Sequence, residues 1–438
     1  MIPLHYKCRT YLAASLVFSS LLYTSCGESG STQAQAGGQG GSAAKTAMAD
    51  SEPRSKDPRL EGARRALAAG QASSARTQLD QLGAAAGVEG PLCEARLAFW
   101  NREVIEALAA VERARKIAPN DSRVFATAAE LLALTERGAD ADDELKLGLA
   151  QAGPTPDIRR AQAVRMLTQP GRGPEALALL EAALAAAPEL PYMAWPLSQA
   201  YLLTARSDLG LGETEVAIEH ALEALSLDPK LSYAYVVLGD GYAGTLDFVS
   251  SLEAYGKAAE AGIDVRREQA DTHMRAGMAA RMVKNHGAAV AHYLAARDLG
   301  LSNLEMSSGA DYLKSQANLA LTAAADAEIA GKLDLAEEHL EEALRMDPRS
   351  LEALDFLGSI RFRGADFAGA AVAWEVLLGY ERESAESRES TTHLNLARAL
   401  VLGERAVEAR GALDAYLEAW PDGPLAAETR EMILRLPE

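Results

Sequence analysis

Apolar and small residues recur along this chain with a period of about 34 residues, and each period contains two stretches with helical spacing. The clearest period begins at Ser232. Its regularly spaced residues are Tyr235, Leu238, Gly239 and Tyr242 on a first helix and Ser251, Tyr255 and Ala258 on a second. The pattern therefore predicts two antiparallel helices in each period.

The residue types at these positions have a packing reason. Small residues such as Gly239 and Ser251 let the two helices approach closely, and larger ones such as Tyr255 fill the space between them. Prolines mark the joints between periods, because proline stops the second helix. These joints are Ala118-Pro119, Ala187-Pro188, Asp228-Pro229 and Asp347-Pro348.

This arrangement resembles the tetratricopeptide repeat (TPR). That pattern has a bulky residue at position 4, Leu at 7, a small residue at 8, Tyr at 11, a small residue at 20, an aromatic at 24 and Ala at 27. The resemblance implies an all-α fold, a right-handed α-α superhelix (solenoid) of about ten TPR-like helix pairs.

The repeat recurs with varying fidelity over residues 56–423. Units begin near Lys56, Val88, Ser122, Asp157, Pro191, Ser232, Ala270, Ala317, Leu351 and Ser390. Residues 424–438 are expected to form a C-terminal capping helix that covers the last apolar face. Extra residues lie near 205–212 and at 303–314, and the second interruption is a possible break in the array.

The first 25 residues have the features of a secretory signal. Lys7 and Arg9 precede an uncharged apolar run from Tyr11 to Tyr23, which is shorter than the about 20 residues that span a bilayer as a helix. Thr24-Ser25-Cys26 then resembles the lipobox of bacterial lipoproteins, in which the cysteine is acylated. The alternatives are an ordinary cleaved signal peptide, and an uncleaved anchor or a wrong start. By the same resemblance, Gly27 rather than Asp after the cysteine favours the outer membrane.

Residues 26–55 are expected to form a flexible tether. This stretch is rich in Gly, Ser, Gln and Ala and has almost no large apolar residue, so it cannot offset the entropy of ordering. A body on such a tether would float free of the membrane.

Composition agrees with closely packed helices. Of the 438 residues, 88 are alanine and only 5% are aromatic, and the small positions of narrow helix pairs account for the alanine. The 62 acidic and 43 basic residues give a net charge of −19, which argues against nucleic acid or an anionic membrane as the main partner. Three cysteines cannot form a disulfide framework.

The search for catalytic chemistry finds little. Gly239-Asp240-Gly241-Tyr242-Ala243-Gly244 matches a dinucleotide-binding pattern, but it lies inside a helical repeat rather than a βαβ unit. His286 and His292 are six residues apart and would point away from each other on a helix. Cys93 is expected to be a buried small hydrophobe. We expect no enzyme activity, no cofactor and no metal site.

If the resemblance holds, positions 2, 5, 9 and 12 of each first helix line the inner curve of the solenoid. The candidate partner-binding groove consists of Tyr192, Trp195, Gln199, Tyr233, Val236, Asp240, Met274 and Arg281. Exposed Tyr and Trp are common anchors for a bound peptide. Alternatively, Tyr192 and Trp195 are simply packed beneath the extra residues near 205–212.

The sequence therefore predicts a non-enzymatic scaffold that binds a protein or peptide partner in its concave groove. It would be lipid-anchored through Cys26 in the bacterial cell envelope, as an outer-membrane lipoprotein facing the periplasm. The alternative is a periplasmic module that binds a small ligand, such as a glycan or cell-wall fragment, between Tyr192, Trp195 and Tyr233.

Overall fold

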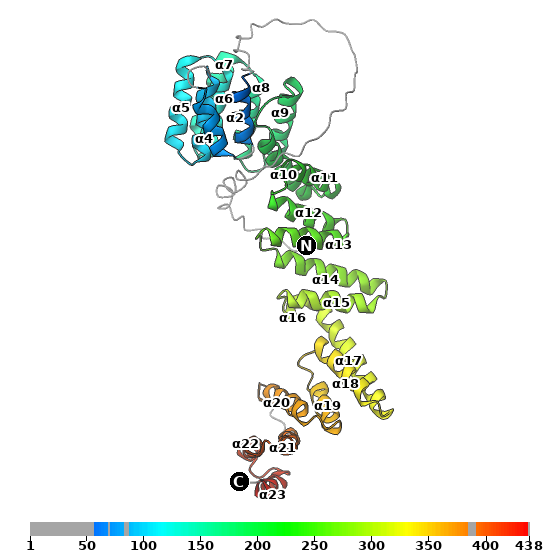
Figure 1. The fold of residues 1–438 in the computed structure, drawn as a ribbon. Helices are drawn as coiled ribbons and strands as arrows, with labels where there is room; N and C mark the ends of the chain where they lie inside the picture. Colours follow the sequence, from blue (N-terminus) through cyan, green and yellow to red (C-terminus); the bar gives the residue numbers. More distant parts are fainter. Residues whose placement is uncertain (1–56, 69–70, 83–86, 384–390, 437–438) are drawn as a thin grey trace. The chain divides into compact units, whose positions relative to one another are not determined.

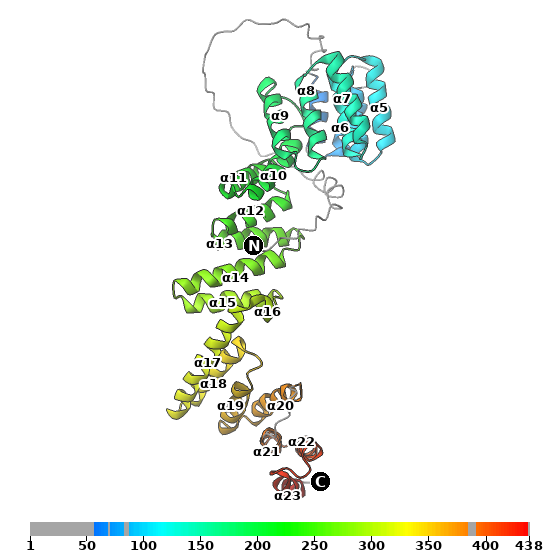
Figure 2. The same cartoon turned by 180° about the vertical axis from the view of Figure 1, so that it is seen from behind.

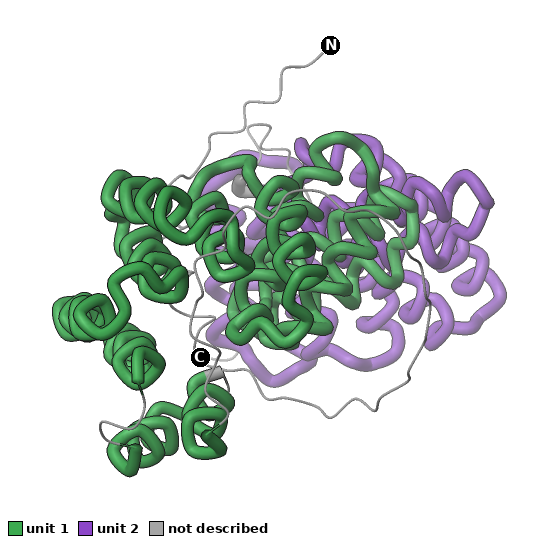
Figure 3. The backbone as a smooth tube through the Cα atoms, turned by 90° about the horizontal axis from the view of Figure 1, so that it is seen from above, with its two compact units in different colours: residues 1–265 green, residues 266–438 purple. Residues whose placement is uncertain are grey.

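The computed structural model describes residues 57–436 apart from 69–70, 83–86 and 384–390. The described residues form 22 α-helices and no strand, so the predicted all-α class is confirmed (Figure 1). The expected signal segment, Cys26 and the expected tether lie outside the described residues. Contacts between the helices divide the chain into two units, residues 1–265 and 266–438 (Figure 3).

The first unit is a series of helix pairs in which each helix packs on the next. The pairs are α2 (Pro58–Ala68) with α3 (Ala72–Asp80), α4 (Glu89–Trp100) with α5 (Val104–Ile117), α6 (Ser122–Leu134) with α7 (Gly138–Ala152), α8 (Pro156–Leu167) with α9 (Gly173–Ala186), α10 (Ala194–Leu211) with α11 (Thr214–Leu227), and α12 (Ser232–Gly244) with α13 (Phe248–Glu260). The first helices of consecutive pairs also contact one another from α2 to α12.

The second unit continues the same pattern, and α14 and α15 lie side by side in Figure 2. Its helices are α14 (Arg266–Met282), α15 (His286–Asp298), α16 (Asn303–Met306), α17 (Ser308–Ile329), α18 (Leu333–Met346), α19 (Leu351–Arg363), α20 (Phe367–Glu383), α21 (Thr392–Leu402), α22 (Ala406–Ala419) and α23 (Ala426–Arg435). Helix α23 packs on α22, and the backbone N–H of Leu425 donates to the Tyr416 hydroxyl at 3.2 Å.

Close approach within the pairs depends on glycine where the repeat pattern has a small residue. A Cβ on Gly277 would lie 2.7 Å from Cε1 of Tyr293, and one on Gly358 would lie 2.5 Å from Cε2 of Trp374. A Cβ on Gly239 would also overlap the ring of Tyr255. The aromatic residue of the second helix therefore packs directly on the backbone of the first, as the pattern predicts.

Alanine fills the last position of the pattern in most pairs, where the second helix faces the first. The alanines at this position are 0–1% exposed, and they are Ala114, Ala183, Ala224, Ala258, Ala296 and Ala343. Because alanine is small and favours helix, it allows many narrow pairs without a single large core.

The extra residues near 205–212 and at 303–314 are helical: the first segment lengthens a helix, and the second adds a short one and begins another. Residues 205–211 extend α10 to 18 residues, and Gly212 ends it with a φ of 83°. Residues 303–314 form α16, which has a Ser302–Glu305 capping box, and the start of the 22-residue α17. The division between the two units follows Val265 and does not fall in this segment.

Candidate functional site

The first unit contains an apolar pocket formed by the first helices of five consecutive pairs, α2, α4, α6, α8 and α10. The cavity measures about 140 Å³. Its walls are mainly apolar and aromatic, and they include Leu67, Phe99, Trp100, Leu131, Leu134, Val164, Tyr192, Trp195 and Pro196. Two of the residues predicted for the groove, Tyr192 and Trp195, therefore line a real cavity.

Tyr192 closes one side of this pocket because the turn before α10 folds back onto α4. Its φ is 63°, an uncommon value for a residue with a side chain. The guanidinium carbon of Arg96 lies 4.1 Å from the centre of the Tyr192 ring, and Arg160 donates to the carbonyl of Pro191 at 2.9 Å. A cation–π contact and a charge-assisted hydrogen bond thus hold the turn in place.

Below the apolar walls, Glu130 joins two arginines. Its carboxylate accepts hydrogen bonds from Arg96 on α4 and from Arg160 on α8, both at 2.7 Å. Asp157 lies 3.3 Å from Arg160 and adds a second negative charge. Glu130, Arg160 and Asp157 are all at most 8% exposed, so the pairing occurs in a poorly hydrated interior.

A second set of ion pairs lies beside the first. Arg123 on α6 donates to Glu89 on α4 at 2.6 Å and also pairs with Asp121. Glu89 pairs in turn with Arg64 on α2. Arg64 also pairs with Glu61, so each of the four arginines in the two sets has at least one carboxylate partner.

The pKa values at this site follow from burial and pairing. Burial raises the pKa of Glu130, but the charges of Arg160 and Arg96 outweigh burial and lower it from 4.5. Burial lowers the pKa of Arg160, yet Glu130 and Asp157 outweigh it and raise the pKa. Burial also raises the pKa of the Cys93 thiol and that of Tyr192. These groups keep their ordinary charge states at neutral pH, which suits a binding surface more than acid–base catalysis.

Two polar nitrogens on α10 are buried without a hydrogen-bond partner. They are Nε1 of Trp195, whose side chain lines the pocket, and Nε2 of Gln199. The two residues are four apart and therefore on the same side of the helix. A buried donor without an acceptor is unfavourable by roughly 1–3 kcal/mol, so these two nitrogens reduce the stability of the first unit.

The extra residues near 205–212 do not line the pocket. They belong to the C-terminal part of α10, whereas Ala194, Trp195 and Pro196 lie at its N-terminal end. Tyr192 packs instead against the apolar cluster of α2, α3 and α4, and Cys93 belongs to that cluster. The prediction that Cys93 is buried is confirmed, since it is 4% exposed.

The other predicted groove residues have different surroundings. Tyr233 and Val236 pack partly against core clusters of α10 to α13. Asp240 is exposed and accepts a hydrogen bond from the Tyr255 hydroxyl at 2.6 Å. These three residues belong to α12 and do not line the pocket.

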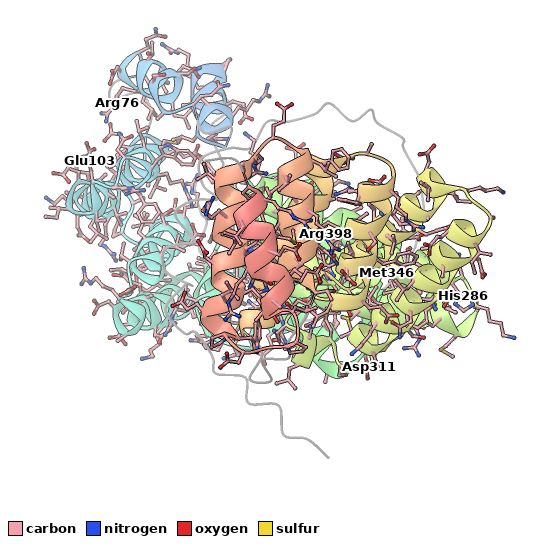
Figure 4. All side chains as sticks on the ribbon, turned by 90° about the horizontal axis from the view of Figure 1, so that it is seen from below. Arg76, Glu103, His286, Asp311, Met346 and Arg398 are labelled. Atoms are coloured by element: carbon pink, nitrogen blue, oxygen red, sulfur yellow. The ribbon has the colours of Figure 1, made fainter. Side chains whose placement is uncertain are left out.

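Met274 and Arg281 lie in the second unit. Met274 is 8% exposed and belongs to the core cluster of α14, α15 and α17, so it offers a partner little surface. The guanidinium of Arg281 lies 4.6 Å from the centre of the Tyr312 ring. His286, which is labelled in Figure 4, contacts the hydroxyl of the same tyrosine through Nδ1 at 2.6 Å.

Sequence reasoning missed the half of the pocket contributed by α4, α6 and α8. Trp100, Arg96, Glu130 and Arg160 come from units that match the repeat pattern weakly. A signal for them exists, because Arg96 and Glu130 are 34 residues apart and so are Glu89 and Arg123. Opposite charges one repeat apart on first helices predict an ion pair between neighbouring repeats.

Elsewhere in the described chain, the side chains give no indication of catalysis. No three His, Cys, Asp or Glu residues within it are placed to share a metal ion. His292 pairs with His273, with their Nδ1 atoms 3.0 Å apart, and not with His286. The segment that matches G-x-G-x-x-G is continuous helix within α12, as the repeat pattern predicts.

The described residues form an array of antiparallel helix pairs, and the small and aromatic residues that pack within the pairs follow a spacing that resembles the tetratricopeptide repeat. No protein-family model matches the chain, and no curated protein matches it. Similar solved structures include human IFIT1 as a dimer with PPP-AAAA, at 18% identity over 72% of this chain and 69% of that one, with a TM-score of 0.34. The TPR2AB domain of yeast Sti1 in its pHSP90 complex is 12% identical over 54% of this chain and 97% of that one, with a TM-score of 0.26.

A third similar structure is pilF of Pseudomonas aeruginosa, at 18% identity over 55% of this chain and 99% of that one, with a TM-score of 0.21. At these identities and TM-scores the similarities identify no shared partner. The repeat assignment rests on the packing of the helix pairs in this chain. Within the residues that the structure describes, no helix is long and apolar enough to cross a membrane.

Proposed function

We propose that this protein is a non-enzymatic scaffold that binds a protein or peptide partner, with the pocket of the first unit as its principal contact. The observation that supports this most is the apolar, aromatic cavity that five consecutive repeats build together. Trp and Tyr are the residues most often found as anchors of protein interfaces, and a concave apolar site with a few polar groups is a common binding geometry.

We further propose that the scaffold is tethered by lipid on Cys26 and faces the periplasm from the outer membrane. The support is the lipobox-like segment that ends at Cys26 and the Gly- and Ser-rich residues after it. The net charge of −19 would keep the folded units away from anionic lipid headgroups.

Crosslinking in intact cells tests the role of the pocket. The wild type, Trp195→Ala and Ile105→Ala would be compared after affinity capture of the crosslinked chain. Ile105 is 80% exposed on α5 of the same unit, so its truncation controls for a nonspecific apolar surface. Loss of a crosslinked partner in Trp195→Ala alone supports the proposal, whereas the same partners in all three chains would remove the pocket from consideration.

Metabolic labelling with a fatty-acid analogue tests the anchor. The wild-type band should incorporate label and fractionate with the outer membrane, and Cys26→Ser should lose both properties. A labelled Cys26→Ser band, or an unlabelled wild type in the cytosol, would contradict the proposed anchor. The binding proposal does not depend on this result.

A further inference from the structure

We propose that the pocket of the first unit binds an uncharged aromatic side chain, of the size of phenylalanine, from a peptide. This inference rests on the proposed function and specifies the chemistry of the partner. Two properties of the pocket support it: its volume and the pairing of its charged groups.

The volume of the pocket matches one aromatic ring. An engineered protein cavity of about 150 Å³ with apolar walls binds benzene, and this cavity measures about 140 Å³. Phe99, Leu131 and Val164 are 7%, 3% and 2% exposed, so much of the wall is shielded from water. A ring that enters the pocket would therefore exchange water for apolar contacts.

The charges at the base of the pocket favour a neutral occupant. Arg96 and Arg160 already share Glu130, and Asp157 also pairs with Arg160. A carboxylate in the pocket would compete with Glu130, and an ammonium would meet two guanidinium groups. Either charged group would also lose its hydration, so both should be rejected relative to phenylalanine.

The opening of the pocket adjoins the N-terminal end of α10. Ala194 is exposed there and also lines the pocket, next to the half-buried Trp195. The backbone of the bound peptide would therefore lie near Ala194.

The test uses the folded chain and blocked pentapeptides. The probe is acetyl-Ala-Ala-X-Ala-Ala-amide with 4-fluorophenylalanine at X, observed by ¹⁹F NMR, and the competitors carry Phe, Ala, Asp or Lys at X. Only the Phe peptide should displace the probe efficiently, by about tenfold or more over the other three. Equal competition by the Asp or Lys peptide, or no probe binding up to about 10 mM, would overturn the inference.

Two variants and a matched control locate the binding. Ala194→Trp should block the opening and weaken probe binding at least about tenfold, and Trp195→Ala should weaken it about fivefold or more because it removes part of the apolar wall. Ala109→Trp, at an exposed alanine of α5, should change nothing. Unchanged binding in either pocket variant would overturn the corresponding part of the inference.

The results also separate this inference from the proposed function. Loss of the cellular partner in Ala194→Trp without selectivity for the Phe peptide would overturn the inference and leave the scaffold proposal standing. Selective binding of the Phe peptide with unchanged partners in Ala194→Trp would instead contradict the pocket's role as the principal contact. Stronger competition by octanamide than by the Phe peptide would mean that the pocket prefers an acyl chain, which overturns the inference.

Discussion

The hydroxyl of Tyr192 lies 3.7 Å from the sulfur of Cys93, although 99 residues separate the two in the chain. Cys93 is on α4, and Tyr192 precedes α10, the first helix three pairs later. This contact brings repeats that are far apart in the sequence to one place. The apolar pocket exists because of it, since Tyr192 forms one of its walls.

Removal of the Tyr192 ring should loosen the pocket and the helices around it. Tyr192→Ala eliminates the contact with Arg96 and leaves space beside Cys93, so we expect a loss of about 3–5 kcal/mol in the stability of the first unit. Hydrogen exchange measured by mass spectrometry should show faster exchange in α4 and α10. Tyr192→Phe keeps the ring and should stay close to wild type, and equal exchange in both variants would show that the ring is not a structural wall.

Removal of the charge on Glu130 should be strongly destabilising. Glu130→Gln leaves Arg96 and Arg160 without their shared carboxylate in the interior, and breaking a buried ion pair of this kind typically causes a loss of about 3–5 kcal/mol. Chemical unfolding followed by circular dichroism measures the loss. The matched control is Glu94→Gln, which breaks the exposed pair with Arg113 and should change stability by less than about 1 kcal/mol.

The pair His273 and His292 should make the second unit sensitive to acid. Burial lowers the pKa of both rings from 6.5, and for His273 the neighbouring His292 lowers it further. Because the folded pKa values lie below the unfolded one, the unfolded chain takes up protons first. The stability of this helix pair is therefore complete above pH 6.5 and falls as the pH falls below it.

Hydrogen exchange of α14 and α15 at pH 7.5 and 5.5, corrected for intrinsic rates, tests whether the stability falls at the lower pH. The wild type should lose protection at the lower pH, and the double variant His273→Asn/His292→Asn should lose less. Protection that increases at pH 5.5 in the wild type would contradict the prediction.

Substitution by alanine should change the stability of the first unit in opposite directions at two glycines of one helix pair. Gly239→Ala places a Cβ against the ring of Tyr255 and should destabilise the first unit by about 1–3 kcal/mol. Gly256→Ala, on α13 of the same pair, meets no atom within 4 Å and should stabilise by about 0.5–1 kcal/mol because alanine favours helix. Thermal unfolding of both variants checks this, and a neutral Gly239→Ala would mean that the helices can move apart.

Much of the fold could be predicted because each helix pair is stabilised by its own sequence. Gly239 with Tyr255, Gly277 with Tyr293 and Gly358 with Trp374 repeat one local packing rule. The ten starting points expected from the pattern lie within three residues of a helix start in eight cases. The exceptions are α14 and α17, which begin four and nine residues before Ala270 and Ala317. Spacing alone does not show whether inserted residues extend a helix or form a loop.

The candidate binding site was less predictable from the sequence than the fold. The repeat pattern identified Tyr192 and Trp195, because they fall at positions expected to line the inner curve. By the same rule it placed Met274 in the groove, whereas the structure packs it in a core cluster. The charged base of the pocket was also missed, since Arg96, Glu130 and Arg160 occur in units with weak matches to the pattern.

The sequence by itself determined the helix pairs, because their spacing, small residues and prolines act over about 34 residues. Only the tertiary structure decided that the first helices of five consecutive pairs in the first unit enclose a pocket. That outcome depends on how far each pair rotates on the next. The rotation follows from the combined packing and ion pairing of residues such as Arg96, Glu130 and Tyr192, which lie one to three repeats apart. No single repeat contains this information.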